Sequence, residues 1–149
     1  MRSKKNRIEI AREIILQTFS FLETEGYISN SKIPSDSTSI ETIDTEYVNV
    51  PKCRKIIISY SMGEFRSEFV HAFHLSIVRM PYVDPMEDYF SLSNYLRSLK
   101  KDYDYRMINH FDDDEASKIV SRIAESLRVY AWDIVKGDRW MKGYYPSWD

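Results

Sequence analysis

Two stretches of the chain repeat apolar residues with the 3.6-residue period of an α-helix. One runs from Ser3 to Glu25 and the other from Asp113 to Lys136. In each, apolar residues recur at steps of three and four, which places them on one helical face. The predicted buried stripes are Ile8, Ala11, Ile15, Phe19 and Leu22 in the first helix, and Ala116, Ile119, Ile123, Leu127, Tyr130 and Ile134 in the second.

The ends of these two helices carry matching signals. Gly26 follows the first helix and Gly137 the second, where a glycine in the left-handed conformation commonly ends a helix. Asp112 stands three residues before Glu115, a spacing that predicts an N-terminal cap at the second helix. Both helices are therefore predicted with defined C-terminal ends.

The middle of the chain changes to strand-like patterns. Glu46–Val50 and Arg54–Ser61 alternate or are rich in β-branched residues, which predicts two strands. Residues 61–64 are predicted to turn, with Gly63 supplying a positive φ. Residues 65–80 fit both a strand and a helix. We favour a strand, because the run contains several β-branched residues and follows another strand.

Three segments lack such periodicity. Ser29–Thr45 is predicted to be a long loop with room for a short irregular strand at residues 40–43. Pro81 and Pro85 bracket a second loop. Ser91–Lys101 is then expected to form a helix capped by Ser91 or Ser93, and residues 102–111 remain unassigned.

The order of these elements predicts the fold class. Strands that cluster together rather than alternate with helices favour an antiparallel sheet. We expect an α+β two-layer sandwich of about three to five strands, with the helices packed on one face. The 149 residues fit a single domain, 1–149, with an aromatic tail at 138–149.

Composition limits the cellular compartments and the kinds of partner that we expect. The net charge is −2, so no overall field draws the chain to nucleic acid or to an anionic membrane. The N-terminal cations, Arg7 among them, are expected to be solvated. Cys53 is the single cysteine, and no apolar run approaches a signal peptide or a membrane span. We therefore expect a cytoplasmic protein.

Candidate reactive residues are scattered along the chain. His71 and His74 would share a face on a helix, but they point to opposite faces of a strand. Without recognisable further ligands we expect no metal site. Cys53 lacks an evident base. Four glycines in all allow no phosphate-binding loop, so we expect no cofactor, and we assign no catalytic residue.

The C-terminal tail is rich in large aromatic rings. Such rings are enriched at protein interfaces, although a terminal segment can also pack back on its own domain. We favour packing back for the segment as a whole. As a hypothesis, the residues proposed to bind a partner are Trp140, Tyr144, Tyr145 and Trp148.

Four segments carry a resemblance to a group of proteins. They are Phe19–Tyr27, Glu46–Asn49, Ile56–Tyr60 and Tyr89–Leu96. Together they resemble small bacterial α+β proteins of the toxin-immunity type. The resemblance implies a protein that binds a cognate toxin and needs no catalytic residues.

Three hypotheses follow. The first is a non-catalytic protein-binding domain, with a toxin as one candidate partner. The second is a small-ligand-binding protein or an enzyme with a pocket between sheet and helices, which requires its candidate residues to converge. The third is a structural protein that forms a homodimer through a sheet edge or the tail. The candidates for the second are Cys53, His71, His74, Asp84, Glu87 and Asp88.

Overall fold

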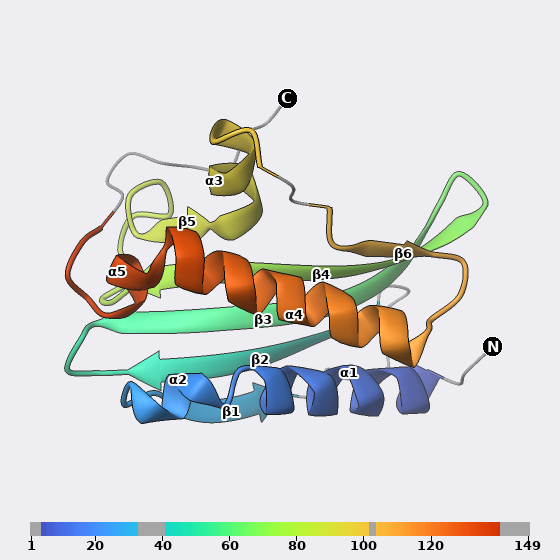
Figure 1. The fold of residues 1–149 in the computed structure, drawn as a ribbon, viewed down its shortest axis with the longest axis horizontal. Coiled ribbons are helices and arrows are strands. Elements are labelled where there is room, and N and C mark those ends of the chain that lie inside the picture. The colour runs from blue at the N-terminus through green and yellow to red at the C-terminus, as the bar shows by residue number, and fades with distance from the viewer. Residues whose placement is uncertain (1–3, 33–40, 102–103, 141–149) are drawn as a thin grey trace.

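A six-stranded antiparallel sheet forms the centre of the computed structural model, which describes residues 4–32, 41–101 and 104–140 (Figure 1). Four strands follow one another across the sheet, and two short strands share the outer edge of the fourth. The strands are β1 (Ile28–Lys32), β2 (Glu41–Asn49), β3 (Arg54–Phe65), β4 (Glu68–Arg79), β5 (Tyr89–Ser91) and β6 (Arg106–Ile108).

Two long helices lie side by side on one face of this sheet (Figure 1). The helix α1 (Lys4–Thr18) contacts β2 and β3, and α4 (Asp113–Tyr130) contacts β4 and β6. The described residues also form three short helices: α2 (Phe21–Thr24), α3 (Leu92–Ser98) and α5 (Trp132–Val135). The two-layer α+β arrangement predicted from the sequence is confirmed.

The core lies between the sheet and the two long helices. Ile56 pairs with Ile77 and Ile58 with Leu75, and all four side chains are buried on the face that carries α1 and α4. The predicted apolar stripes of both helices are buried against them, except that Tyr130 is half-buried. Each such side chain contributes about 1.5–3 kcal/mol on burial, so this face holds most of the apolar stabilisation.

Two predictions about the strands are corrected. The segment 29–45 is not one long loop, because its two ends form residues 29–32 of β1 and residues 41–45 of β2, and the second of these overlaps the short strand expected at residues 40–43. An edge strand has one neighbour and needs little apolar patterning, and Ile28 of β1 is indeed exposed. With β6, which lies in the unassigned segment, the sheet exceeds the expected three to five strands.

The turn between β3 and β4 also lies later than predicted. Gly63 sits within β3 opposite Val70, without a positive φ. The turn is made by Arg66 (φ 52) and Ser67 (φ 68). A two-residue hairpin turn with positive φ at both positions matches the twist of the strands. The strand prediction for residues 65–80 is confirmed by β4.

Both long helices end earlier than predicted. At Leu22 and Glu23 the backbone N–H groups bond to carbonyls three residues earlier, which separates α2 from α1. At Ala131 the backbone (φ −133, ψ 19) leaves the helical region and separates α5 from α4. The predicted cap at Asp112 is confirmed, because its carboxylate accepts from the Glu115 N–H at 2.9 Å.

One charged residue is buried against expectation. Arg7 in the first turns of α1 is only 4% exposed, although we expected the N-terminal cations to be solvated. The long arginine side chain can bury its stem among apolar neighbours. The packing of α1 on the sheet therefore includes a cation that the sequence pattern does not distinguish from its neighbours.

Candidate functional site

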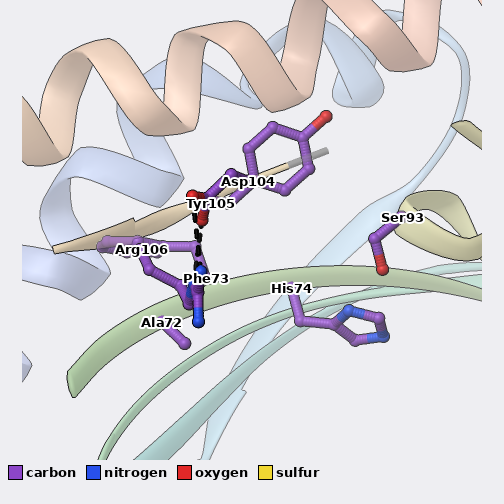
Figure 2. Close-up of a pocket in the computed structure, with 7 residues that line it drawn as sticks. All are labelled: Ala72, Phe73, His74, Ser93, Asp104, Tyr105 and Arg106. Atoms are coloured by element: carbon purple, nitrogen blue, oxygen red, sulfur yellow. Dashed lines mark hydrogen bonds and ion pairs between the residues drawn. The ribbon is translucent and has the colours of Figure 1, made fainter. Parts of the chain in front are cut away.

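The outer edge of β4 is interrupted by a cleft. β5 pairs with Ser76–Val78 and β6 with Val70–Ala72, which leaves Phe73, His74 and Leu75 between them. A cleft of about 580 Å³ opens at this gap. Its lining comes from β4, α3 and the segment entering β6: Ala72, Phe73, His74, Ser93, Asp104, Tyr105 and Arg106 (Figure 2).

His74 lies on the face of the sheet that is turned away from α1 and α4, here called the open face. Its Nε2 atom is 3.2 Å from the hydroxyl of Tyr89 on β5. Burial lowers the pKa of His74 below 6.5 and raises the pKa of Tyr89 above 10. Both groups are therefore uncharged at neutral pH, and their hydrogen bond joins two neutral side chains.

Ser93 faces His74 across the cleft. Figure 2 shows its hydroxyl pointing toward the imidazole. Ser93 is placed by the first turn of α3, where Ser91 caps the helix by accepting from the Asn94 N–H. The two serine hydroxyl oxygens are 3.3 Å apart. The cap prediction for Ser91 is thus confirmed, and the same turn places a second hydroxyl in the cleft.

The charges in the cleft cancel. The guanidinium of Arg106 donates from Nε to the Asp104 carboxylate at 2.8 Å (Figure 2). This hydrogen bond holds the pKa of Asp104 below its ordinary value. Both side chains are largely exposed, so the pair contributes little to stability. The cleft therefore carries polar groups without a net charge.

A second hollow of about 450 Å³ adjoins the first and shares Ala72 and Arg106 with it. It lies over the far part of the β3–β4 hairpin. Its lining is Ser61, Met62, Gly63, Glu64, Phe65, Val70, Ala72 and Arg106. We call the two hollows together the open-face groove: a polar half at His74 and Ser93, and a more apolar half at Gly63 and Val70.

The groove ends at exposed apolar side chains. Phe65 is 62% exposed, Phe69 37% and Ile108 44%. Phe65 lines the second hollow and Ile108 pairs with Val70, so both lie on the open face. Phe69 stands two residues before His71 on β4 and therefore points to the helix side. We call these three residues the hairpin tip. In Figure 1 the hairpin reaches past the ends of α1 and α4.

The predicted candidate residues do not meet in one site. His71 and His74 point to opposite faces of β4, as a strand requires. The ring of His71 is buried on the helix side, where its Nδ1 lies 2.8 Å from the Tyr60 hydroxyl. Cys53 is exposed in the turn between β2 and β3. Among the candidates, His74 alone lines the groove.

The three acidic candidates belong to the loop between β4 and β5. Asp88 accepts from the N–H groups of Asp84 and Val83 and from the guanidinium of Arg79. These hydrogen bonds, that from Asp84 first, hold the pKa of Asp88 below its ordinary value. Asp84 and Glu87 stand in the same loop. The carboxylates of Asp84 and Asp88 accept from backbone N–H groups of this loop, which accounts for these two residues without acid–base chemistry.

Two polar residues near His74, a serine and an aspartate, were not among the candidates predicted from the sequence. Ser59 lies opposite His74 on β3, and Asp44 lies opposite Ser59 on β2. The Ser59 hydroxyl, however, donates to the Asp44 carboxylate at 2.7 Å. A nucleophilic serine needs a base that accepts its proton and is itself oriented by a third group. In this row the serine donates to the aspartate and not to the histidine, so the three residues form a polar strip across the open face and not a nucleophile with its base.

The tail begins by packing on the sheet. Two arginines lie over the ring of Trp140, with its centroid 4.9 Å from Arg54 Cζ and 5.2 Å from Arg79 Cζ. Its Nε1 donates to the Glu87 carbonyl at 2.7 Å. Tyr144, Tyr145 and Trp148 lie outside the described residues. Their role in partner binding stays a prediction.

The fold and the groove define an α+β protein with helices on one face of its sheet and a groove on the other. No family model matches the chain, and comparisons with curated proteins and with solved structures find no match either. Within residues 4–32, 41–101 and 104–140, no three His, Cys, Asp or Glu side chains are grouped to hold a metal ion. No helix in these ranges is long and apolar enough to cross a membrane.

Proposed function

We propose that this protein is a non-catalytic protein-binding domain of the toxin-immunity type, acting in the cytoplasm. The partner docks on the hairpin tip and the open-face groove. The observation that carries the proposal is the exposure of Phe65 and Ile108 on the open face, with Phe69 exposed on the opposite face of the same projecting hairpin. Clustered exposed apolar side chains, aromatic ones above all, mark protein-interaction surfaces.

The chemistry of the groove supports binding rather than catalysis. In its polar half the ionised groups are paired as Asp104 and Arg106, and His74 is neutral and bonded to Tyr89. A general acid–base pair needs two groups with opposed pKa shifts beside one reacting atom. Among the described residues that line the groove, His74 is the single histidine that could act as a member of such a pair.

The immunity type is supported by the small α+β frame and by the resemblance of its sequence segments. An immunity protein acts by occupying a surface of its toxin, so it needs a shaped and partly apolar face instead of a reaction centre. Both requirements agree with a hairpin tip that is aromatic and a groove that is polar at one end and apolar at the other.

An affinity pull-down from a lysate of the source organism tests the proposal. The baits are the unaltered protein, the double variant Phe65→Ser/Phe69→Ser, and Val129→Ser, which removes an exposed apolar side chain on α4 far from the hairpin. We expect one stoichiometric protein that survives moderate salt on the first and third baits. The double variant should lose at least about tenfold in affinity, since central aromatic residues dominate interfaces.

Two outcomes would contradict the proposal. One is a folded bait that retains no protein at low salt. The other is a partner held equally by all three baits, which would move the interface elsewhere. A recovered partner whose isolated expression arrests growth, with rescue by this protein, would support the immunity type. A chain ending at residue 140 would test the further contribution of Tyr144, Tyr145 and Trp148.

A further inference from the structure

Gly63 occupies an unusual position in the sheet. It lies inside β3, paired with Val70, and its backbone has no positive φ. A Cβ atom built on it would meet no described atom within 4 Å. Neither conformation nor crowding therefore accounts for glycine here, although glycine weakens a strand interior. Such a position often marks the close approach of another backbone or a ligand.

The surroundings of Gly63 give this approach a direction. The hollow above it is floored by Val70 and Ala72 and ends at Phe65. Along β4 the groove continues to His74, whose Nδ1 has no hydrogen-bond partner among the described residues. From Val70 to His74 the strand rises roughly 13 Å, the length of four extended residues. The groove thus runs from an apolar seat to hydrogen-bonding groups over a peptide-sized distance.

We infer that the open-face groove binds an extended segment of the protein partner that lacks acidic side chains, with one apolar side chain over Gly63 and a peptide group hydrogen-bonded at His74 and Ser93. The inference rests on the proposed function and names the part of the partner that fits. The hairpin tip would add contacts beside this segment.

Charge selects the segment. Asp104 and Arg106 neutralise each other at 2.8 Å, and Glu64 adds a further acidic residue to the lining of the apolar half. An anionic ligand would have to separate this pair, whereas a peptide backbone supplies carbonyl and N–H groups without a charge. An apolar side chain would bury carbon against Val70 and Ala72, and Gly63 leaves the space for it.

Chemical-shift titration of the isotopically labelled full chain tests the inference with three probes: the blocked tripeptide Ala-Phe-Ala, the blocked tripeptide Ala-Ala-Ala, and inorganic phosphate. We expect Ala-Phe-Ala to shift the amide signals of Gly63, Val70, Ala72 and His74, with millimolar affinity. Ala-Ala-Ala should bind at least several-fold more weakly, and phosphate should leave these signals in place.

Gly63→Val places a side chain in the open space above residue 63, where the apolar side chain of the peptide would bind. It should abolish the chemical-shift changes without lowering the melting temperature. Asn30→Val is the matched control, because it places the same side chain on the exposed edge strand β1, and its titration should equal that of the unaltered protein. Gly63→Ala gives a smaller obstruction and a graded loss, and it serves as well if the valine variant does not fold.

Absence of shifts with Ala-Phe-Ala, or unchanged shifts in Gly63→Val, would overturn the inference. So would phosphate shifting the His74 and Arg106 signals more strongly than the peptide, which would indicate an anion site. Concentration-dependent shifts without any probe would instead place a second copy in the groove. If the peptides fail but the partner is still captured in a manner that depends on Phe65, the proposed function stands without this inference.

Discussion

The two ends of the β3–β4 hairpin are built from the same pair of strands and use their side chains in opposite ways. At one end Arg54 pairs with Arg79, and both guanidinium groups lie over the ring of Trp140. At the other end Gly63 pairs with Val70 beneath an open hollow. The first end binds its own tail, and the second leaves its apolar atoms to solvent.

The difference shows which end of the hairpin stabilises the sheet and which end is available for binding. Arg54 is 6% exposed and donates to the carbonyls of Ile134 and Arg139, which ties β3 to the residues after α4. Among the described residues, no comparable set of side-chain contacts covers Gly63. We therefore expect substitutions at the first end to change the free energy of unfolding, and substitutions at the second end to change binding.

The largest expected effect is at Arg54. Arg54→Ala leaves buried carbonyl oxygens without donors and removes a cation from the face of Trp140. We expect a loss of about 3 kcal/mol in the free energy of unfolding, measured by urea denaturation. Lys55→Ala is the control, since the neighbouring lysine points to the open face with a 3.9 Å ion pair to Glu46. An equal loss in both variants would refute the comparison.

Trp140→Ala comes next. It removes two cation–π contacts and the hydrogen bond to the Glu87 carbonyl. We expect a loss of about 2 kcal/mol, read as a lower melting temperature. Trp140→Phe keeps a ring but not the N–H donor, so it should lose less. A melting temperature unchanged by Trp140→Ala would show that the start of the tail does not support the fold.

Gly63→Ala should act in the opposite direction. Alanine at this position meets no described atom and restricts the unfolded chain, so we expect a gain of about 0.5–1 kcal/mol. Gly26→Ala is the contrasting control. Its backbone has φ +92 and its Cβ would lie 3.2 Å from Asn49 Nδ2, so that variant should be destabilised. Loss of stability in Gly63→Ala would show that crowding holds the glycine after all.

The smallest effect at neutral pH concerns His74, between the two ends. Burial lowers its pKa, so below pH 6.5 the unfolded chain binds more protons than the folded one. The free energy of unfolding should therefore fall as the pH is lowered through 6.5, and His74→Gln should reduce that slope. Denaturation midpoints at a series of pH values measure it. Identical slopes in both proteins would contradict the buried, neutral histidine.

Much of this architecture is visible in the local pattern. The cap at Asp112, the apolar stripe from Ala116 to Leu127 and the opposed histidines of β4 depend on residues within a few positions of one another. The start of the segment 29–45 was not predicted as a strand, because β1 is polar and gains its conformation from the hydrogen bonds to β2. A polar edge strand and a polar loop look alike without their neighbours.

The site was less predictable than the fold. His74 was a candidate, but Ser93, Asp104 and Arg106 join it through the split edge of β4, which no short-range pattern encodes. Gly63 was interpreted as a turn residue, since glycine commonly fills turns. Its place inside a strand is set by the left-handed pair Arg66 and Ser67, which begins three residues later.

By itself the sequence determined the helices, the central strands, the α+β class and the face on which each strand residue lies, because periodicity and capping act over single turns or adjacent residues. Tertiary structure decided which residues meet: Trp140 with Arg54 and Arg79, and Ser93 with His74 in a groove that ends at Phe65. Those contacts join segments separated by many residues, and they form only when sheet pairing and helix packing bring the segments together.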